Sequence, residues 1–171
     1  MPTLSLLETR VLGTLYEKQY TVPDTYPLSL NALVAGCNQK SSRSPVMEAS
    51  EAEVLAAIDS LKSANLVIES SGSRVTRYSH NLERVLQVPS QSAALLAVLM
   101  LRGPQTAGEL RSRASRMAKL ESLDLLGRVL SRLMEHGYVE RLPPAPGSRA
   151  ERYVQLIAPG LHPLDVGSAP A

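Results

Sequence analysis

Residues 61–78, LKSANLVIESSGSRVTRY, and residues 133–153, LMEHGYVERLPPAPGSRAERY, decide the fold of this chain because they follow one pattern. Each begins at the end of an apolar-striped helix, continues with a short strand-like segment, turns at Gly-Ser-Arg and ends in Arg-Tyr. The offset between the copies is 72 residues at the helix end and 75 at the Arg-Tyr pair, so the second turn is three residues longer. Repetition of a whole supersecondary pattern predicts two similar domains, each with a β-hairpin at its end.

Three predicted helices precede each hairpin. Capping boxes, in which a Ser or Thr side chain and a Glu three residues later exchange hydrogen bonds with backbone N–H groups, stand at Ser5–Glu8, Ser50–Glu53 and Thr106–Glu109. With apolar residues at helical spacing, they predict helices over about 5–19, 30–38 and from residue 50 in the first half, and over about 90–101, 109–120 and 122–135 in the second. Both halves therefore have the order helix, helix, helix, hairpin.

This order predicts a mainly α protein with small β-hairpins, of the α+β class, built as two tandem winged helix-turn-helix domains. We expect the first domain over residues 1–84 and the second over residues 85–158, with a linker at 82–89. Residues 159–171 are rich in Pro, Gly and Ala and lack periodicity, so we expect a disordered tail there.

Composition narrows the protein class. No apolar run approaches the ~20 residues of a membrane span, and the single cysteine cannot form an internal disulfide. These features lead us to expect a cytoplasmic protein without a membrane partner. The net charge of +2 is uneven, because residues 1–86 hold 8 basic and 9 acidic residues whereas residues 87–171 hold 10 basic and 7 acidic ones.

A longer motif set gives a family resemblance. The motifs are Glu17-Lys-Gln, Tyr26-Pro-Leu-Ser-Leu-Asn-Ala-Leu33, Cys37-Asn-Gln-Lys40, Arg43, Pro45-Val-Met47, Ser50-Glu-Ala-Glu-Val54, Leu101-Arg-Gly-Pro-Gln-Thr-Ala-Gly-Glu-Leu-Arg111 and Glu151-Arg-Tyr153. Together they resemble the YceH-like bacterial proteins from about residue 4 to residue 157. The resemblance implies a tandem winged-helix protein of unassigned biochemical function, and it implies no known ligand.

The winged-helix prediction makes DNA the first candidate ligand, since the third helix of such a domain usually enters the major groove while the hairpin contacts phosphates. In the first domain the outward residues of that helix include Glu53 and Asp59 and no base, which disfavours it as a groove reader. We therefore predict that double-stranded DNA contacts come mainly from the second domain. The candidate DNA-binding residues are Arg74, Arg77, Arg111, Arg113, Arg116, Lys119, Arg128, Arg132, Arg149 and Arg152.

Structural roles compete with these assignments. The basic helix residues also fit a solvated face that neighbouring carboxylates partly neutralise. Arg77 and Arg152 also fit repeated pairing with Glu69 and Glu140. A second polar set lies around the only cysteine, which we expect to be a small buried hydrophobe. That set forms either a hydrogen-bond network that fixes the loop or a partner surface, and it consists of Asn31, Asn38, Gln39, Lys40 and Arg43.

No catalytic arrangement is visible in the sequence. The three histidines are far apart in the expected fold, none has a metal-ligand spacing with the cysteine, and no Gly-rich phosphate loop occurs. We therefore expect no enzyme activity, no cofactor and no metal. Two functions stay open: a DNA-binding protein such as a transcriptional regulator, or a non-enzymatic interaction scaffold whose tandem domains bind a protein partner or a second copy of the chain.

Overall fold

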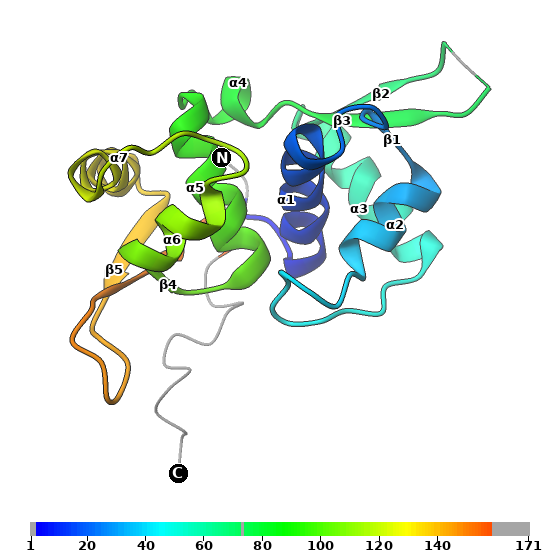
Figure 1. Cartoon of the computed structure of the whole chain (residues 1–171). Coiled ribbons are helices and arrows are strands. Elements are labelled where there is room, and N and C mark those ends of the chain that lie inside the picture. The colour runs from blue at the N-terminus through cyan, green and yellow to red at the C-terminus, as the bar shows by residue number, and fades with distance from the viewer. Residues whose placement is uncertain (1–2, 73, 159–171) are drawn as a thin grey trace.

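A computed structural model of the chain describes residues 3–72 and 74–158, so the expected tail at 159–171 lies outside the described residues. Figure 1 shows two halves side by side. The first half contains α1 (Leu6–Thr21), β1 (Leu28–Ser29), α2 (Leu30–Cys37), α3 (Glu51–Ser63), β2 (Val67–Ser70), β3 (Arg77–His80) and α4 (Leu82–Leu86). The second half contains α5 (Ser90–Arg102), β4 (Gln105–Thr106), α6 (Ala107–Ala114), α7 (Leu123–Glu135), β5 (Val139–Leu142) and β6 (Arg152–Gln155).

The predicted helix starts are confirmed. Ser5, Ser50 and Thr106 each cap a helix with both bonds of the capping box in place. Ser29 and Ser122 cap α2 and α7 with one side-chain bond each. Each cap satisfies backbone N–H groups that the first helical turn leaves without a partner. The helix expected over 109–120 is shorter than predicted, since α6 ends at residue 114.

The two sheets repeat each other in register. Both are antiparallel and three-stranded, in the orders β1-β3-β2 and β4-β6-β5. Arg77 lies opposite Ser29 in the first sheet, and Arg152 lies opposite Thr106 in the second. This match supports the alignment of the two hairpins by the 75-residue offset and confirms the α+β class. The winged-helix assignment stays a prediction, although the element order is the same in both halves.

The turn between the third helix and the hairpin is also repeated. Asn65 has a φ of 62° and Gly137 a φ of 78°, and these residues are 72 positions apart. Both take the left-handed conformation that ends a helix, which Gly adopts without strain and Asn tolerates. Two short strands, β1 and β4, were not predicted, because two residues are too few to show a strand period.

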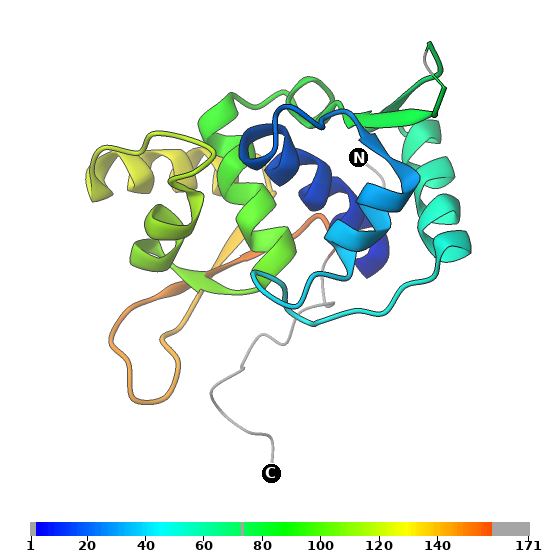
Figure 2. The ribbon, with the colours of Figure 1, turned by 45° about the vertical axis from the view of Figure 1, so that its right-hand side comes forward.

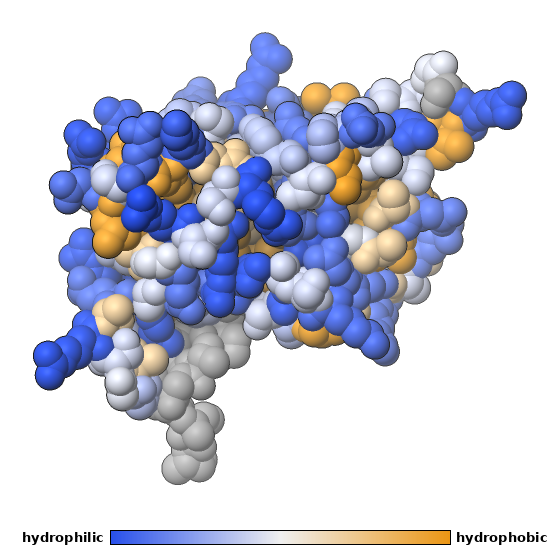
Figure 3. Space-filling model, in the orientation of Figure 1, coloured by the Kyte–Doolittle hydropathy of each residue, from blue (hydrophilic) through white to orange (hydrophobic). Residues whose placement is uncertain are grey.

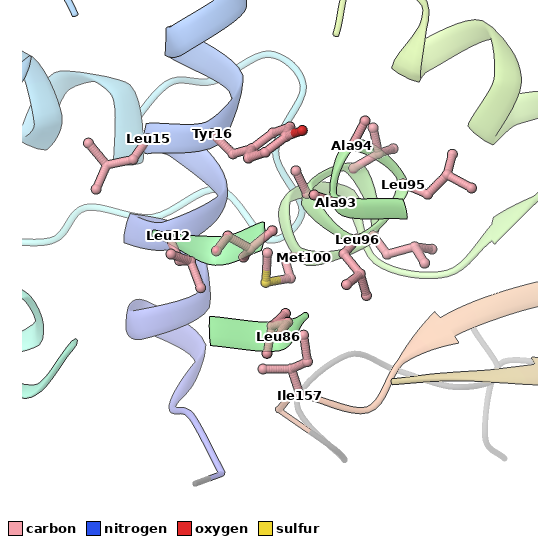
Figure 4. Close-up of a cluster of buried hydrophobic side chains, with 14 of the residues drawn as sticks. Leu12, Leu15, Tyr16, Leu86, Ala93, Ala94, Leu95, Leu96, Met100 and Ile157 are labelled. Carbon is pink, nitrogen blue, oxygen red and sulfur yellow. The ribbon is translucent and has the colours of Figure 1, made fainter. Parts of the chain in front are cut away.

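One core joins the halves. α1 packs along α5, and Leu12 and Tyr16 of α1 lie beside Ala93 and Met100 of α5 (Figure 4). The helices approach so closely that a Cβ on Gly13 would lie 2.9 Å from the Leu101 side chain. Every residue of α5 from 92 to 101 is buried, which leaves α5 as the central helix of the molecule.

The linker predicted at 82–89 is part of this core. It contains α4, whose Leu82 and Leu86 are fully buried. Their four-residue spacing puts both side chains on one helix face, and burial of that face ties the segment down. The Tyr138 hydroxyl donates to the Leu86 carbonyl, and the Tyr16 hydroxyl donates to the Ser90 carbonyl, each at 3.0 Å. The two halves are therefore held by bonds as well as by apolar contact.

The helices α3 and α7 lie at opposite ends of the molecule, with α1 and α5 between them (Figures 1 and 2). Among the helices of residues 3–72 and 74–158, none is long and apolar enough to cross a membrane.

Candidate nucleic-acid interface

The outer face of α7 is the strongest candidate surface. Its inner face buries Leu126, Val129, Leu130 and Leu133, as predicted. Helical spacing then turns Arg128 and Arg132 outward, and both are exposed. Within the described part of the chain no carboxylate lies within 4.0 Å of either guanidinium. These two cations are therefore available to an anionic ligand.

The equivalent face of α3 is more acidic, although α7 also exposes Asp124 and Glu135 beside its two arginines. Its inner side buries Val54, Ala57, Ile58 and Leu61, as predicted, and its outer side exposes Glu51, Glu53 and Asp59. The only cation of this helix, Lys62, is bound to Glu69 at 2.8 Å. The face is therefore repelled by a phosphate backbone.

Arg111 and Lys119 hold the loop between α6 and α7. Arg111 donates from Nε to the Leu120 carbonyl at 3.0 Å and from Nη2 to the Glu121 carbonyl at 2.7 Å. Lys119 lies 3.7 Å from the Glu121 carboxylate, with both side chains exposed. Arg111 thus has a structural role at the start of α7, although it remains exposed. The loop also lines a hollow of about 780 Å³ between α6 and Leu123.

Arg113 binds residues of its own half, and Arg116 lies near the first half. Arg113 donates to the Gln105 side chain and lies 3.6 Å from Glu109. Arg116 lies 3.7 Å from Glu17 of α1. The predicted row of basic residues at 111–119 therefore divides between a loop support and the junction of the two halves, rather than forming one continuous strip with α7.

The four hairpin arginines of the predicted DNA-binding set also divide into two pairs. Arg77 donates to the Pro27 carbonyl at 3.0 Å, and Arg152, which is 7% exposed, donates to the Pro143 carbonyl at 3.2 Å. These equivalent residues fix backbone next to the central strand, and Glu69 pairs with Lys62 instead of Arg77. Arg74 and Arg149, on the hairpin loops, are exposed. Arg149 is thus open to phosphate, whereas the exposed Arg141 of β5 lies 3.8 Å from Glu151.

The polar set near the cysteine mostly forms a local network. The Asn38 side chain donates to the Ala49 carbonyl and accepts from the Ala49 N–H, at 2.9 and 2.8 Å. Gln39 accepts from Lys18 at 2.9 Å and donates to the Ser41 carbonyl. Arg43 is buried. Asn31 and Lys40 are exposed. Three of the five residues therefore support the network interpretation of this loop.

A buried charge cluster, missed at the sequence level, anchors that loop to α1. Arg43 binds Glu17 through two bonds at 2.8 and 3.1 Å, and Lys18 lies 3.2 Å from the same carboxylate. Burial alone would raise the pKa of Glu17, but the bonds and charge of Arg43 hold it below its ordinary value. Arg10, fully buried, donates to the carbonyls of Cys37 and Pro45. Glu17 and Arg43 both stand in the resemblance motifs, which was the only sequence signal for this pair.

The described residues form no metal site. No group of three or more His, Cys, Asp or Glu side chains there could hold a metal ion. Cys37 is fully buried, as expected, and burial raises the pKa of its thiol to about 11. Such a thiol stays protonated at neutral pH and is a poor nucleophile.

Comparison with known proteins finds a matching family and several relatives. Residues 4–148 match a family described as "Protein of unknown function, DUF480". A UPF0502 protein of Dechloromonas aromatica (strain RCB) is 56% identical over 171 residues, covering 98% of this chain and 80% of the relative. A UPF0502 protein of Cupriavidus necator is 56% identical over 157 residues, covering 91% of this chain and 65% of the relative. A UPF0502 protein of Burkholderia orbicola (strain MC0-3) is 52% identical, covering 98% and 72%.

Proposed function

The chain belongs to the bacterial DUF480 (UPF0502) family, with which its YceH-like motifs agree, and from its surface we propose that it is a non-enzymatic protein that binds double-stranded DNA through its second half. The observation that carries the proposal is the outer face of α7, where Arg128 and Arg132 are exposed and have no carboxylate within 4.0 Å among residues 3–72 and 74–158.

The position of α7 in its half supports DNA binding by this face. α7 is the third helix of its half and is followed directly by the hairpin β5–β6, which is the order in which winged-helix proteins place the groove-entering helix and the wing. On duplex DNA the two α7 guanidinium groups contact phosphates or the O6 and N7 acceptors of guanine. Arg149, on the hairpin loop, adds a phosphate contact beside the groove. A regulatory role in transcription follows if these contacts select a sequence.

The first half has a different place in the complex. Since α3 lies at the opposite end of the molecule and exposes acids, a duplex on α7 leaves the first half pointing away from the DNA (Figure 2). One chain thus engages one duplex with one half. The interaction with DNA is dominated by charge, so its affinity falls as salt rises.

Fluorescence anisotropy of a labelled generic duplex of about 30 base pairs tests the proposal at low and moderate salt. We expect a linear dependence of log affinity on log salt, with a slope of about −0.9 for each phosphate contacted. Arg128→Ala/Arg132→Ala should make this slope shallower by about 2. The matched control, Arg74→Ala/Arg84→Ala, removes two exposed arginines of the first half and should leave the slope unchanged. Absence of binding at low salt would contradict the proposal and favour the interaction scaffold.

A further inference from the structure

We propose that Arg102, Arg113 and Arg116, here called the junction cluster, form a binding site for a phosphate group where the two halves meet. This site lies apart from the α7 face and does not rest on duplex binding by α7.

A chain of contacts brings the junction cluster together. The Gln105 side chain accepts from Arg113 and donates to the backbone carbonyls of Arg102 and Gly103. Arg102 in turn donates from Nη2 to the Ser42 hydroxyl at 2.8 Å, which reaches the loop of the first half. The three arginines thus come from α5, α6 and the segment just after α6. Gln105 links Arg113 to the backbone at Arg102, and Arg116 lies 3.7 Å from Glu17, which also binds Arg43, the neighbour of Ser42.

The carboxylates beside the cluster are already engaged. Glu17, 3.7 Å from Arg116, is buried and takes two short bonds from Arg43, while Lys18 lies 3.2 Å away. Glu109 is 3.6 Å from Arg113 and also closes the capping box of α6. Among the described residues no carboxylate lies within 4.0 Å of the Arg102 guanidinium. The junction therefore holds more positive charge than its own acids neutralise.

The state of Arg102 supports this view. Burial lowers its pKa, and repulsion from Arg113 and Arg116 lowers it further, against the opposite effect of Glu17. A cation that is half-buried among cations gains most when an anion arrives, because the anion relieves the repulsion and replaces lost hydration. The geometric contacts and the charge balance thus point in the same direction.

The cluster is open to solvent on one side. The side chain of Arg116 is 56% exposed and that of Arg113 is 34% exposed. Figure 3 shows strongly hydrophilic residues in the middle of this face, over the region where α6 crosses in front of α5. An incoming anion can therefore reach guanidinium N–H groups that the protein leaves unused.

Guanidinium chemistry selects phosphate as the class of ligand. Each planar guanidinium offers a fork of N–H donors that matches two oxygens of a phosphate group, and charge-assisted bonds of this kind are the strong ones. The phosphate of a nucleotide, of inorganic phosphate and of a DNA backbone all offer this chemistry. Bound phosphate would link α5 and α6 to residue 42 of the first half and so fasten the junction.

Thermal unfolding with phosphate tests the site. The full chain is melted at constant ionic strength with chloride partly replaced by inorganic phosphate or pyrophosphate, at millimolar concentrations where general exclusion from the protein surface is small. We expect a saturable rise in Tm for the wild type and for Arg128→Gln, the matched control on α7. The rise should be lost in Arg116→Gln, whose exposed side chain makes little contribution to folding, and in Arg102→Gln, and should persist in part in Arg116→Lys.

Isothermal titration of the same variants with pyrophosphate gives a second readout, in which we expect at least tenfold weaker binding for Arg116→Gln. Equal responses of wild type, Arg102→Gln and Arg116→Gln in both measurements would overturn the proposal. A 30-base-pair duplex that displaces pyrophosphate identifies DNA as the source of the phosphate, and simultaneous binding identifies a free phosphorylated ligand. These melts keep their meaning if the chain fails to bind duplex DNA, so the two proposals can fail separately.

Discussion

The helices α3 and α7 occupy the same place in the two halves but differ in charge. α3 holds three acids and one Lys, whereas α7 holds two acids and two Arg. Residues 56 and 60 of α3 are Ala and Ser, and the positions 72 residues further on, in α7, are Arg128 and Arg132. The inner faces of the two helices are both aliphatic. This difference shows that the repeated fold requires apolar residues on the inner face of these helices but leaves the outer face free to differ between the two halves.

The arginines of the hairpins show the same division. Arg77 and Arg152 are equivalent and both donate to backbone carbonyls, so the repeat preserves a structural role. Arg10 of α1 and Arg43 of the loop that joins α2 to α3 are buried, whereas Arg128, Arg132 and Arg149 of the second half face solvent. The two buried arginines of the first half hold the chain together, and the three exposed arginines of the second half are available to ligands.

The largest expected effect is on the free energy of unfolding and distinguishes buried arginines from exposed ones. Arg43→Ala leaves Glu17 buried without its main partner and should lower the free energy of unfolding by about 3–5 kcal/mol, toward the lower end because Lys18 remains near. Arg132→Ala should change it by less than about 0.5 kcal/mol. Urea denaturation measures both. A loss below 1 kcal/mol for Arg43→Ala would contradict the difference between buried and surface arginines. The double variant Glu17→Gln/Arg43→Met should recover part of the stability that Arg43→Ala loses.

A second prediction concerns acid sensitivity. His80 and Gln155 hold equivalent strand positions, opposite Val67 and Val139. Burial lowers the pKa of His80 to about 4, whereas an unfolded histidine has a pKa of about 6.5. As pH falls from 6.5 toward 4, the unfolded state gains a proton that the folded state does not bind. The contribution of His80 to stability is therefore fully present above pH 6.5 and is lost as the pH falls through this window.

The size of this loss can be measured. Urea midpoints at pH 7, 6 and 5 should show about 2 kcal/mol of lost stability at pH 5 from His80 alone. His80→Gln, which copies the second half, should flatten the profile between pH 7 and 5. An equally steep profile in the variant would assign the acid sensitivity to other groups.

The smallest expected effect comes from moving the α7 charge to α3. Ala56→Arg/Ser60→Arg should add at most two phosphate contacts, so a rise in salt from 50 to 200 mM should lower affinity for a generic duplex by at most about tenfold more than in the wild type. This effect is reduced because Glu8 and Glu53 line the hollow at Ala56 and attract the new cations. The reciprocal Arg128→Ala/Arg132→Ser is the matched variant. An unchanged salt slope in the α3 variant would show that charge alone does not make this helix a DNA contact.

The local structure was predictable from sequence because its causes are local. Capping boxes at Ser5, Ser50 and Thr106, aliphatic stripes and the repeated Gly-Ser-Arg turn each act over a few residues. The strands β1 and β4 escaped because two residues show no period. The segment 82–89 was read as a linker because its two core leucines are too few to show a helical stripe.

The candidate site was predictable only in part. Arg128 and Arg132 follow from the helical wheel, since an aliphatic inner face fixes which side chains point outward. The wheel does not reveal that Arg152 reaches the Pro143 carbonyl or that Arg116 lies near Glu17, because these partners come from other segments. Arg10 and Glu17 were missed for a related reason: charged residues in a helix are read as surface, and their burial depends on partners more than 25 residues away.

The close packing of α1 against α5 also sets an order of events during synthesis. α1 is complete at residue 21, whereas α5, whose Leu101 side chain lies against Gly13, is complete only at residue 102. At ~5–20 residues per second the growing chain takes roughly 4–16 seconds to make the intervening segment. The apolar side of α1 that α5 covers stays open during that time. The apolar core of the nascent first half is therefore incomplete until the second half leaves the ribosome and α5 packs against α1.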